Sequence, residues 1–103
     1  MHFTYIIRCK DDSLYTGYTN NILRRMKEHE SGINSKYTRN KGFKKLEVYF
    51  ISDTRSKAMK LESLIKKQTR YKKLNIIKKP QEFINEIEGG CNYIVGVIND
   101  TCN

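Results

Sequence analysis

Five polar residues of this sequence carry side chains that could do chemistry together: Tyr5, Tyr15, Arg25, His29 and Glu62. Phenol and imidazole groups can exchange protons, a guanidinium can hold an anion, and a carboxylate can hold a hard metal ion. Arg25 and His29 are four residues apart, so in a helix they share one face. An exposed helix would show the same spacing, and His29 would then have no catalytic role.

Glu62 is the most informative of these residues. On a helix it projects within roughly 40° of Ala58 and close to Leu61 and Ile65, so it borders an apolar face. A carboxylate in that position loses hydration unless it is paired or binds a cation. Two partners remain open from the pattern alone: an ion pair with Lys66 one turn later, or a metal ion.

The net charge predicts a polyanionic partner. The 103 residues contain 20 Lys and Arg against 11 Asp and Glu, a formal charge of +9. Such an excess favours nucleic acid through counterion release and electrostatic steering, although a solubilising surface would also be basic. The length predicts one compact domain. No membrane partner is expected, because no stretch approaches the roughly 20 apolar residues that span a bilayer.

The cysteines indicate a reducing compartment. Cys9, Cys91 and Cys102 are odd in number and widely spaced, so they form neither a disulfide framework nor the close pairs of a zinc site. The segment Met1–Tyr5 lacks the basic and apolar blocks of a signal peptide. We therefore expect a cytoplasmic protein.

The elements that must position these residues begin with an antiparallel hairpin. Residues 3–9 alternate as a strand that places Tyr5 and Ile7 on one face, and residues 14–17 start a second strand after the polar turn 10–13. A helix is expected next, from a cap at Thr19 or Asn20 to about His29, ended by Ser31-Gly32. An exposed loop over 34–45 and a strand over 46–51 follow. The rest of the domain is expected to contain a helix capped by Asp53 or Thr54, a shorter helix over 72–79 and, after Pro80, an amphipathic turn or two over 82–88.

These elements predict an α+β fold (α/β in the broad sense), with a small three-stranded antiparallel sheet flanked by helices. Residues 1–88 are predicted to form the domain. Residues 89–103 are expected to be a C-terminal tail of unknown role, which either adds a strand at a sheet edge or stays disordered.

In their order and spacing, the motifs resemble those of the GIY-YIG nuclease family, specifically its small stand-alone members. The matching segments are Phe3-Thr4-Tyr5-Ile6, Tyr15-Thr16-Gly17, the helix Asn20–His29 with its double arginine, Lys36-Tyr37-Thr38-Arg39, and Glu62. Either tyrosine segment alone is a weak match, whereas the ordered set, which covers residues 3–79, is specific. The sequence departs from the family pattern at Phe3, Thr4 and Thr16, and at Tyr18, where several relatives carry a lysine, so one cationic group could be missing.

The resemblance implies a metal-dependent endonuclease that hydrolyses phosphodiester bonds in DNA. Tyr5 would take a proton from the attacking water, and Tyr15 would hydrogen-bond in the same site. Arg25 would hold a phosphate oxygen, His29 would assist near the nucleophile or the phosphate, and Glu62 would be the one protein ligand of Mg²⁺ or Mn²⁺. Because a phenol has a pKa near 10, Tyr5 needs nearby positive charge to act as a base.

Two basic clusters are candidates for contacts with the DNA backbone, although the first could also be a solvated loop. Neither cluster can specify a sequence, and no separate recognition domain is predicted. This favours structure-selective or weakly selective cleavage, for example of single-stranded or branched DNA in repair, recombination or processing. The candidate residues are Lys36, Tyr37, Arg39, Lys41 and Lys44 in the first cluster, and Lys66 and Arg70 in the second.

Two other functions explain part of the sequence. A nucleic-acid-binding module could keep the fold but cleave poorly or not at all. A small basic protein of a ribonucleoprotein would explain the charge but not the ordered tyrosines, arginine and glutamate. Metal-dependent nicking that is lost on substitution of Glu62 separates the enzyme from both.

Overall fold

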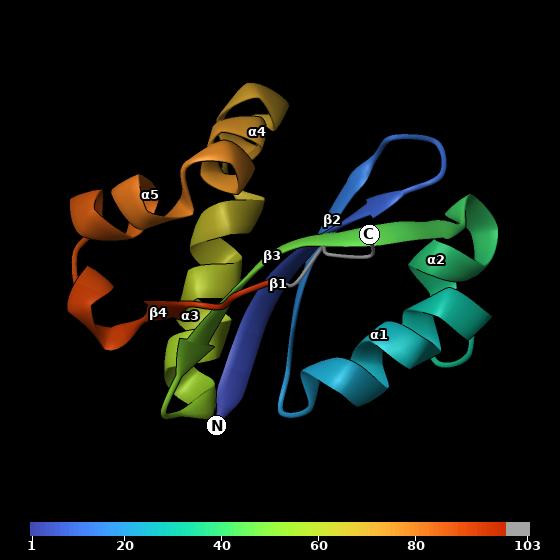
Figure 1. Ribbon diagram of the computed structural model, residues 1–103, viewed down its shortest axis with the longest axis horizontal. Helices are drawn as coiled ribbons and strands as arrows, with labels where there is room; N and C mark the ends of the chain where they lie inside the picture. The colour runs from blue at the N-terminus through green and yellow to red at the C-terminus, as the bar shows by residue number, and fades with distance from the viewer. Residues whose placement is uncertain (99–103) are drawn as a thin grey trace.

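A four-stranded antiparallel sheet lies at the centre of the computed structural model, which describes residues 1–98 (Figure 1). Its strands are β1 (His2–Cys9), β2 (Leu14–Thr19), β3 (Phe43–Ser52) and β4 (Ile94–Val95), in the spatial order β2-β1-β3-β4. The predicted α+β class and antiparallel arrangement are confirmed. The predicted number of three strands is wrong, because β4 pairs with β3. The end of the predicted tail, residues 99–103 with Cys102, lies outside the described residues.

The hairpin of β1 and β2 forms as predicted. Tyr5 pairs with Gly17 across the two strands. In the turn, the Asp11 carboxylate accepts a hydrogen bond from the Ser13 backbone N–H at 3.0 Å, and Asp12 adopts a left-handed φ of 70°. An Asp side chain that bonds the backbone two residues later is a common way to reverse the chain in a short turn.

Helices cover both faces of the sheet (Figure 1). No helix within residues 1–98 is long and apolar enough to cross a bilayer. The face that carries Tyr5 packs against α1 (Ile22–Ser31) and α2 (Lys36–Lys41), and the face that carries Ile6 packs against α3 (Arg55–Lys66), α4 (Arg70–Lys78) and α5 (Pro80–Glu86), which is followed by the short 3₁₀ helix η1 (Gly90–Asn92).

The helix caps correct one prediction and decide another. The cap of α1 is Asn21, whose side chain accepts from the Arg24 N–H at 3.0 Å, and not Thr19 or Asn20. Thr19 instead accepts from the Asn21 N–H at 3.1 Å and so supports the cap residue. Of the two candidates for α3, Thr54 is the cap, with its hydroxyl accepting from the Lys57 N–H.

The predicted exposed loop over residues 34–45 is wrong. It contains helix α2, and β3 begins at Phe43 rather than at Leu46. The helix is short and mostly solvated, with Thr38 as its one buried residue. A single inward-facing side chain leaves no periodic apolar pattern, and the surrounding basic residues read as a loop. Tertiary contacts, and not amphipathic periodicity, hold this segment in place.

The segment around β4 is attached to the sheet by more than strand pairing. The Gly96 N–H donates to the Tyr49 carbonyl at 2.8 Å, and the Tyr49 hydroxyl donates to the Val97 carbonyl at 3.3 Å. A Cβ at position 96 would lie 2.1 Å from the Tyr49 ring, so glycine is required where the backbone passes the ring. Of the two alternatives for this segment, the edge strand is the one observed.

Two core clusters lie on opposite faces of the sheet. The first packs Ile6 of β1 against aliphatic residues of α3 and of the helices that follow it. The second contains Tyr5, Ile7 and Cys9 of β1, packed against α1, α2 and aromatic residues. Successive residues of β1 therefore face alternately the aliphatic cluster and the cluster that contains Tyr5.

Candidate active site

Tyr5, Arg25 and His29 meet at one buried phenol oxygen. The Tyr5 hydroxyl shares a hydrogen bond of 2.8 Å with His29 Nε2, and Arg25 Nε donates to the same oxygen at 3.3 Å. The Tyr5 and His29 side chains are each about 1% exposed. Helix α1 therefore turns the face shared by Arg25 and His29 toward β1. The alternative in which His29 lies on an exposed helix face is wrong.

A pair of hydroxyl groups holds the other ring nitrogen of His29. Nδ1 lies 2.9 Å from Ser35 Oγ and 3.1 Å from Thr38 Oγ1, and the Thr38 hydroxyl donates to Ser35 at 2.7 Å. Burial and, to a smaller extent, the positive charge of Arg25 lower the pKa of His29 to about 4, although the charge of Glu28 acts in the opposite direction. The imidazole is therefore neutral at neutral pH, in a fixed orientation.

Without a metal ion, the protein environment keeps the Tyr5 phenol protonated. Burial raises its pKa to about 12, although the hydrogen bond and charge of Arg25 act in the opposite direction. The charge of Glu62 also raises this pKa, which places the carboxylate within electrostatic range of the phenol. Arg25 is thus part of the positive charge that a tyrosine base needs, but it does not outweigh desolvation.

Gly17 lies where the Tyr5 hydroxyl needs space. A Cβ built on Gly17 would lie 2.5 Å from the Tyr5 hydroxyl oxygen and 3.1 Å from the Tyr15 ring. The phenol of β1 therefore lies directly across the backbone of β2, which no larger residue would allow. This close approach explains in physical terms why the second motif ends in glycine.

Tyr15 links the buried cluster to an open cleft. Its ring centroid lies 5.7 Å from that of His29 and 4.8 Å from that of Tyr37. Beside it, a cleft of about 480 Å³ opens between α1 and α2. The cleft is lined by polar and basic groups, which suit a nucleic-acid backbone. They are Tyr15, Arg25, Asn34, Ser35, Lys36, Tyr37, Asn40 and Lys41.

Arg25 is positioned for a ligand in this cleft. Its Nη1 donates to the Glu28 carboxylate at 2.9 Å and to the Asn34 carbonyl at 3.1 Å, while Nε is bound to Tyr5. Its Nη2 makes no hydrogen bond within residues 1–98, so it remains available for an oxygen of a ligand. Three fixed contacts restrict the guanidinium to one orientation.

Glu62 borders the core of α3 as the sequence pattern predicts. Its side chain is 17% exposed and pairs with Lys66 at 3.3 Å, so the predicted ion pair is present. Within residues 1–98 no three His, Cys, Asp or Glu residues gather at one point. A single partly buried carboxylate can hold a divalent cation only when the remaining ligands are water or phosphate oxygens, as is usual for Mg²⁺.

The predicted DNA-binding residues divide into two groups. Lys36, Tyr37 and Lys41 line the cleft, and the Lys41 ammonium lies 5.7 Å from the centre of the Tyr37 ring. The others are not gathered around it: Lys44 lies 3.8 Å from Asp12, and the cleft lining excludes Arg39, Lys66 and Arg70.

No sequence pattern singled out Ser35 or Asn34 as candidate site residues. Ser35 and Thr38 are three residues apart, which places both hydroxyls on the inner side of the start of α2. That spacing was the available signal, but it has meaning only once α2 is known to be a helix that packs on His29. The Asn34 contact uses a backbone carbonyl, which no side-chain pattern reveals.

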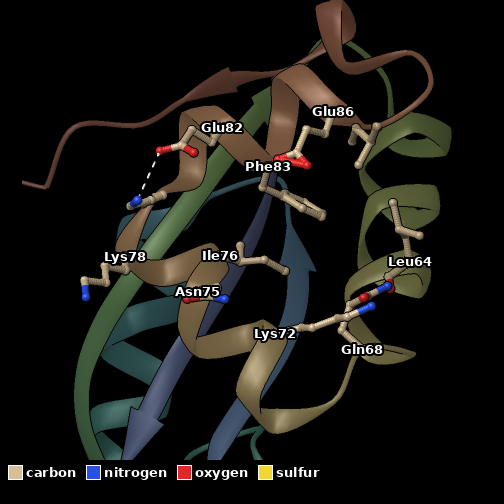
Figure 2. A pocket seen from close by; sticks show the side chains of 11 residues that line it. Leu64, Gln68, Lys72, Asn75, Ile76, Lys78, Glu82, Phe83 and Glu86 are labelled. Carbon is tan, nitrogen blue, oxygen red and sulfur yellow. Dashed lines mark hydrogen bonds and ion pairs between the residues drawn. The ribbon is translucent and has the colours of Figure 1, made fainter.

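A second cleft, of about 540 Å³, lies between α3, α4 and α5, on the other side of the sheet from Tyr5 (Figure 2). Figure 2 shows that Glu82 and Glu86 share it with Lys72 and Lys78. Because acidic and basic side chains share this cleft, it lacks the uniformly basic character that a polyanion requires.

Comparisons with known proteins give matches over most of the chain. Residues 1–75 match the family model of the GIY-YIG catalytic domain. A UPF0213 protein of Fusobacterium nucleatum is 46% identical over 87 residues, which cover 84% of this chain and 87% of that protein. A UPF0213 protein of Clostridium perfringens is 46% identical over 77 residues, covering 75% and 83%. The solution NMR structure of a UPF0213 protein from Bacillus halodurans is 41% identical, covers 75% of this chain and 82% of that chain, and has a TM-score of 0.49.

Proposed function

Because the chain belongs to the GIY-YIG family of nucleases, we propose that it is a metal-dependent endonuclease that hydrolyses phosphodiester bonds in DNA. The observation that carries this proposal is the buried contact of Tyr5, Arg25 and His29 over Gly17. A purely structural core has no need of an imidazole and a guanidinium on one phenol oxygen beside a basic cleft. We propose Tyr5, Tyr15, Arg25, His29 and Glu62 as the catalytic residues.

The proposed role of His29 follows from its hydroxyl partners. Thr38 donates to Ser35, and we propose that the Ser35 hydroxyl in turn donates to Nδ1. In this tautomer the ring proton lies on Nε2 and is donated to the phenol oxygen of Tyr5, which also accepts from Arg25. Two donors on one oxygen stabilise the tyrosinate, the form that takes a proton from water. Since both ring nitrogens of His29 are occupied by protein groups, we propose that it acts through Tyr5.

The remaining positive charge that Tyr5 needs would come from a metal ion held by Glu62. When bound there, Mg²⁺ or Mn²⁺ would supply positive charge to the phosphate and to the leaving oxygen. Glu62 would hold the ion in place of its present partner Lys66. Arg25 would hold a non-bridging phosphate oxygen through Nη2, in the cleft where Tyr15 also lies. The cleft residues Lys36, Tyr37 and Lys41 would bind the strand that carries this phosphate.

The substrate range is proposed from the size of the basic surface. The cleft between α1 and α2 can hold a strand backbone, with the rings of Tyr15 and Tyr37 available for base stacking. It offers no element for reading base edges in a duplex groove. We therefore propose structure-selective or weakly selective cleavage of single-stranded or branched DNA, in repair, recombination or processing within the cytoplasm.

The test is a cleavage assay with single-stranded, duplex and branched DNA, in Mg²⁺, in Mn²⁺ and in chelator. The wild type should nick DNA only with metal, and Glu62→Ala and Tyr5→Phe should suppress nicking while DNA binding survives. The matched controls are Glu82→Ala, which removes another carboxylate that faces a lysine, and Tyr93→Phe, which removes another hydrogen-bonded tyrosine hydroxyl. Both should cleave like the wild type.

Two outcomes would contradict the proposal. Equal cleavage by the wild type and Glu62→Ala would place the activity elsewhere or in a contaminant. DNA binding by the wild type without cleavage in any metal would support the alternative, a nucleic-acid-binding module that keeps this fold without turnover.

A further inference from the structure

A tyrosine–arginine pair lies outside the site described above. Arg55, the first residue of α3, donates from Nε and Nη2 to the Tyr18 hydroxyl at 3.3 and 3.0 Å. The guanidinium carbon also lies 5.8 Å from the centre of the Tyr18 ring. Tyr18 directly follows Gly17 on β2, so the pair adjoins the strand that crosses the proposed active site. The guanidinium of Arg55 on α3 thus places a positive charge beside position 18, although position 18 itself carries a tyrosine.

Arg55 differs from Arg8 and Arg25 in having no carboxylate partner among the described residues. No Asp or Glu within residues 1–98 forms an ion pair with it, whereas Arg8 and Arg25 each pair with a glutamate. The acidic residue beside it in sequence, Asp53, is bound by Lys57 at 2.9 Å. Arg55 Nη1 makes no hydrogen bond in the described part of the chain. An arginine fixed by a neutral partner, with free donors, suits a bidentate oxyanion such as phosphate.

Helix geometry aligns this pair with Glu62. At about 100° per residue, Arg55, Glu62 and Lys66 project within roughly 40° of one another along α3. Seven residues separate Arg55 from Glu62, which is roughly 10 Å along the helix axis. Arg55 also lines a shallow depression with Ser56, Met59 and Lys60, which adds further donors and one ammonium group. The depression is open to solvent, as a backbone contact requires.

The edge of the sheet connects these groups. Strand β2 is the outermost strand and has no partner on its outer side within residues 1–98. Arg25 comes from α1 on one face of this strand, and Arg55 and Glu62 come from α3, which packs on the other face. A strand of DNA that crosses the β2 edge from the cleft would pass from Arg25 on one face to Glu62 and Arg55 on α3 at the other face.

We propose that Arg55, positioned by Tyr18, binds a backbone phosphate of the nucleic-acid strand a few nucleotides from the one that is cleaved. This inference rests on the proposed function. It adds a second phosphate site on the α3 side of β2, opposite the cleft between α1 and α2. Tyr18 is a positioning residue in this site, because it fixes the guanidinium through its hydroxyl and ring.

The test measures DNA binding at several salt concentrations, since each phosphate contact that is lost reduces the salt dependence. A labelled single-stranded oligonucleotide is titrated with Glu62→Ala protein in chelator, so that no cleavage interferes. Adding Arg55→Gln should weaken binding several-fold and reduce the slope of log K against log salt by about 0.7. Adding Tyr18→Phe should weaken binding less, and it should have no further effect when Arg55→Gln is already present.

The matched control is Lys78→Gln, which removes one exposed positive charge on α4. Arg55→Lys, which keeps the charge but not the planar fork, should retain the slope and lose part of the affinity. If Arg55→Gln and Lys78→Gln give the same slope, the second phosphate site is overturned while the proposed nuclease stands. If the parent protein binds no DNA at low salt, both proposals are overturned.

Discussion

At the centre of strand β1, Ile6 and Ile7 are both fully buried, but the two faces of the strand are built from different chemistry. Ile6 packs into a cluster of aliphatic residues and one phenylalanine pair contributed by β3 and α3–α5. Its neighbour Ile7 belongs to the cluster of Tyr5, whose hydroxyl is bound to Arg25 and His29. The first face depends mainly on apolar area and dense packing, although the buried Thr4 hydroxyl on that face donates to the Ala58 carbonyl at 2.8 Å. The second face buries the Tyr5 hydroxyl and the His29 imidazole, and their hydrogen bonds hold the proposed catalytic groups in place.

This difference teaches that stability and chemistry can be separated by one residue along a strand. On the aliphatic face, side chains of similar volume should be exchangeable at small cost. On the face of Tyr5, a shift of a few tenths of an ångström changes which groups donate to the phenol oxygen. The following predictions test that separation, from the largest expected effect to the smallest.

Ile6→Ala and Ile7→Ala form a matched pair, because both side chains are fully buried on the same strand. Each should lower the free energy of unfolding by about 2–5 kcal/mol through lost burial and the cavity left behind. Only Ile7→Ala should also reduce the cleavage rate of the folded protein. Urea unfolding and single-turnover cleavage measure the two effects. Equal rate losses in both variants would show that the faces are not functionally separate.

Acid should destabilise the face of Tyr5 through His29. Its pKa is about 4 in the folded protein against an ordinary value of 6.5, so the unfolded chain binds this proton more readily between those values. With respect to His29, the free energy of unfolding should therefore be highest above about pH 6.5 and should decrease toward pH 4, by up to about 1.4 kcal/mol per pH unit. Urea unfolding at a series of pH values measures this slope.

The matched variants for this prediction are His29→Gln and His2→Gln. The first should be less stable at pH 7 but should lose most of the pH dependence between 4 and 6.5, and the second should keep it. A His29→Gln protein with the slope of the wild type would assign the dependence to other groups.

Gly17→Ala should reduce cleavage far more than it reduces stability. The new methyl group must displace the Tyr5 hydroxyl, which would lie 2.5 Å away. Overpacking of this kind costs about 1–3 kcal/mol, yet we expect a loss of about 100-fold or more in cleavage because the phenol leaves Arg25 and His29. Alanine at Gly89, a glycine remote from the site, serves as the control for cleavage. Wild-type cleavage by Gly17→Ala would mean that the phenol position is not critical.

Thr16→Val should have the smallest effect and raise stability. Thr16 Oγ1 is the one buried side-chain oxygen or nitrogen without a hydrogen-bond partner within residues 1–98. Replacing an unsatisfied hydroxyl with a methyl group of similar shape should stabilise the fold by about 1 kcal/mol. Thermal unfolding measures this gain. A loss of stability would indicate that the hydroxyl has a partner, such as a bound water.

The sequence predicted the parts of the site that repeat along an element. Alternation along residues 3–9 placed Tyr5 and Ile7 on one face, and the spacing of four placed Arg25 with His29. The position of Glu62 followed from its angle to the apolar stripe of α3. In each case a regular backbone converts residue spacing into direction, so a local rule was sufficient.

The parts that the sequence did not predict depend on contacts between distant segments. The hydroxyls of Ser35 and Thr38 gain a role only because α2 folds back on His29. Likewise, the pairing of Tyr18 with Arg55 joins residues 37 positions apart. The pKa of Tyr5 also could not be predicted from a sequence pattern, because it depends on how far the effect of burial exceeds the opposing effect of Arg25.

Strand β4 has a consequence for association between chains. An uncovered strand edge offers free N–H and C=O groups to any other strand in solution. Pairing of Ile94 and Val95 with the end of β3, reinforced by the hydrogen bond from Gly96 to Tyr49, removes that opportunity on one side of the sheet. A chain shortened before Ile94 would regain it, and we expect such a chain to form dimers or aggregates through β3. The short strand β4 thus protects the end of β3 from pairing with another chain.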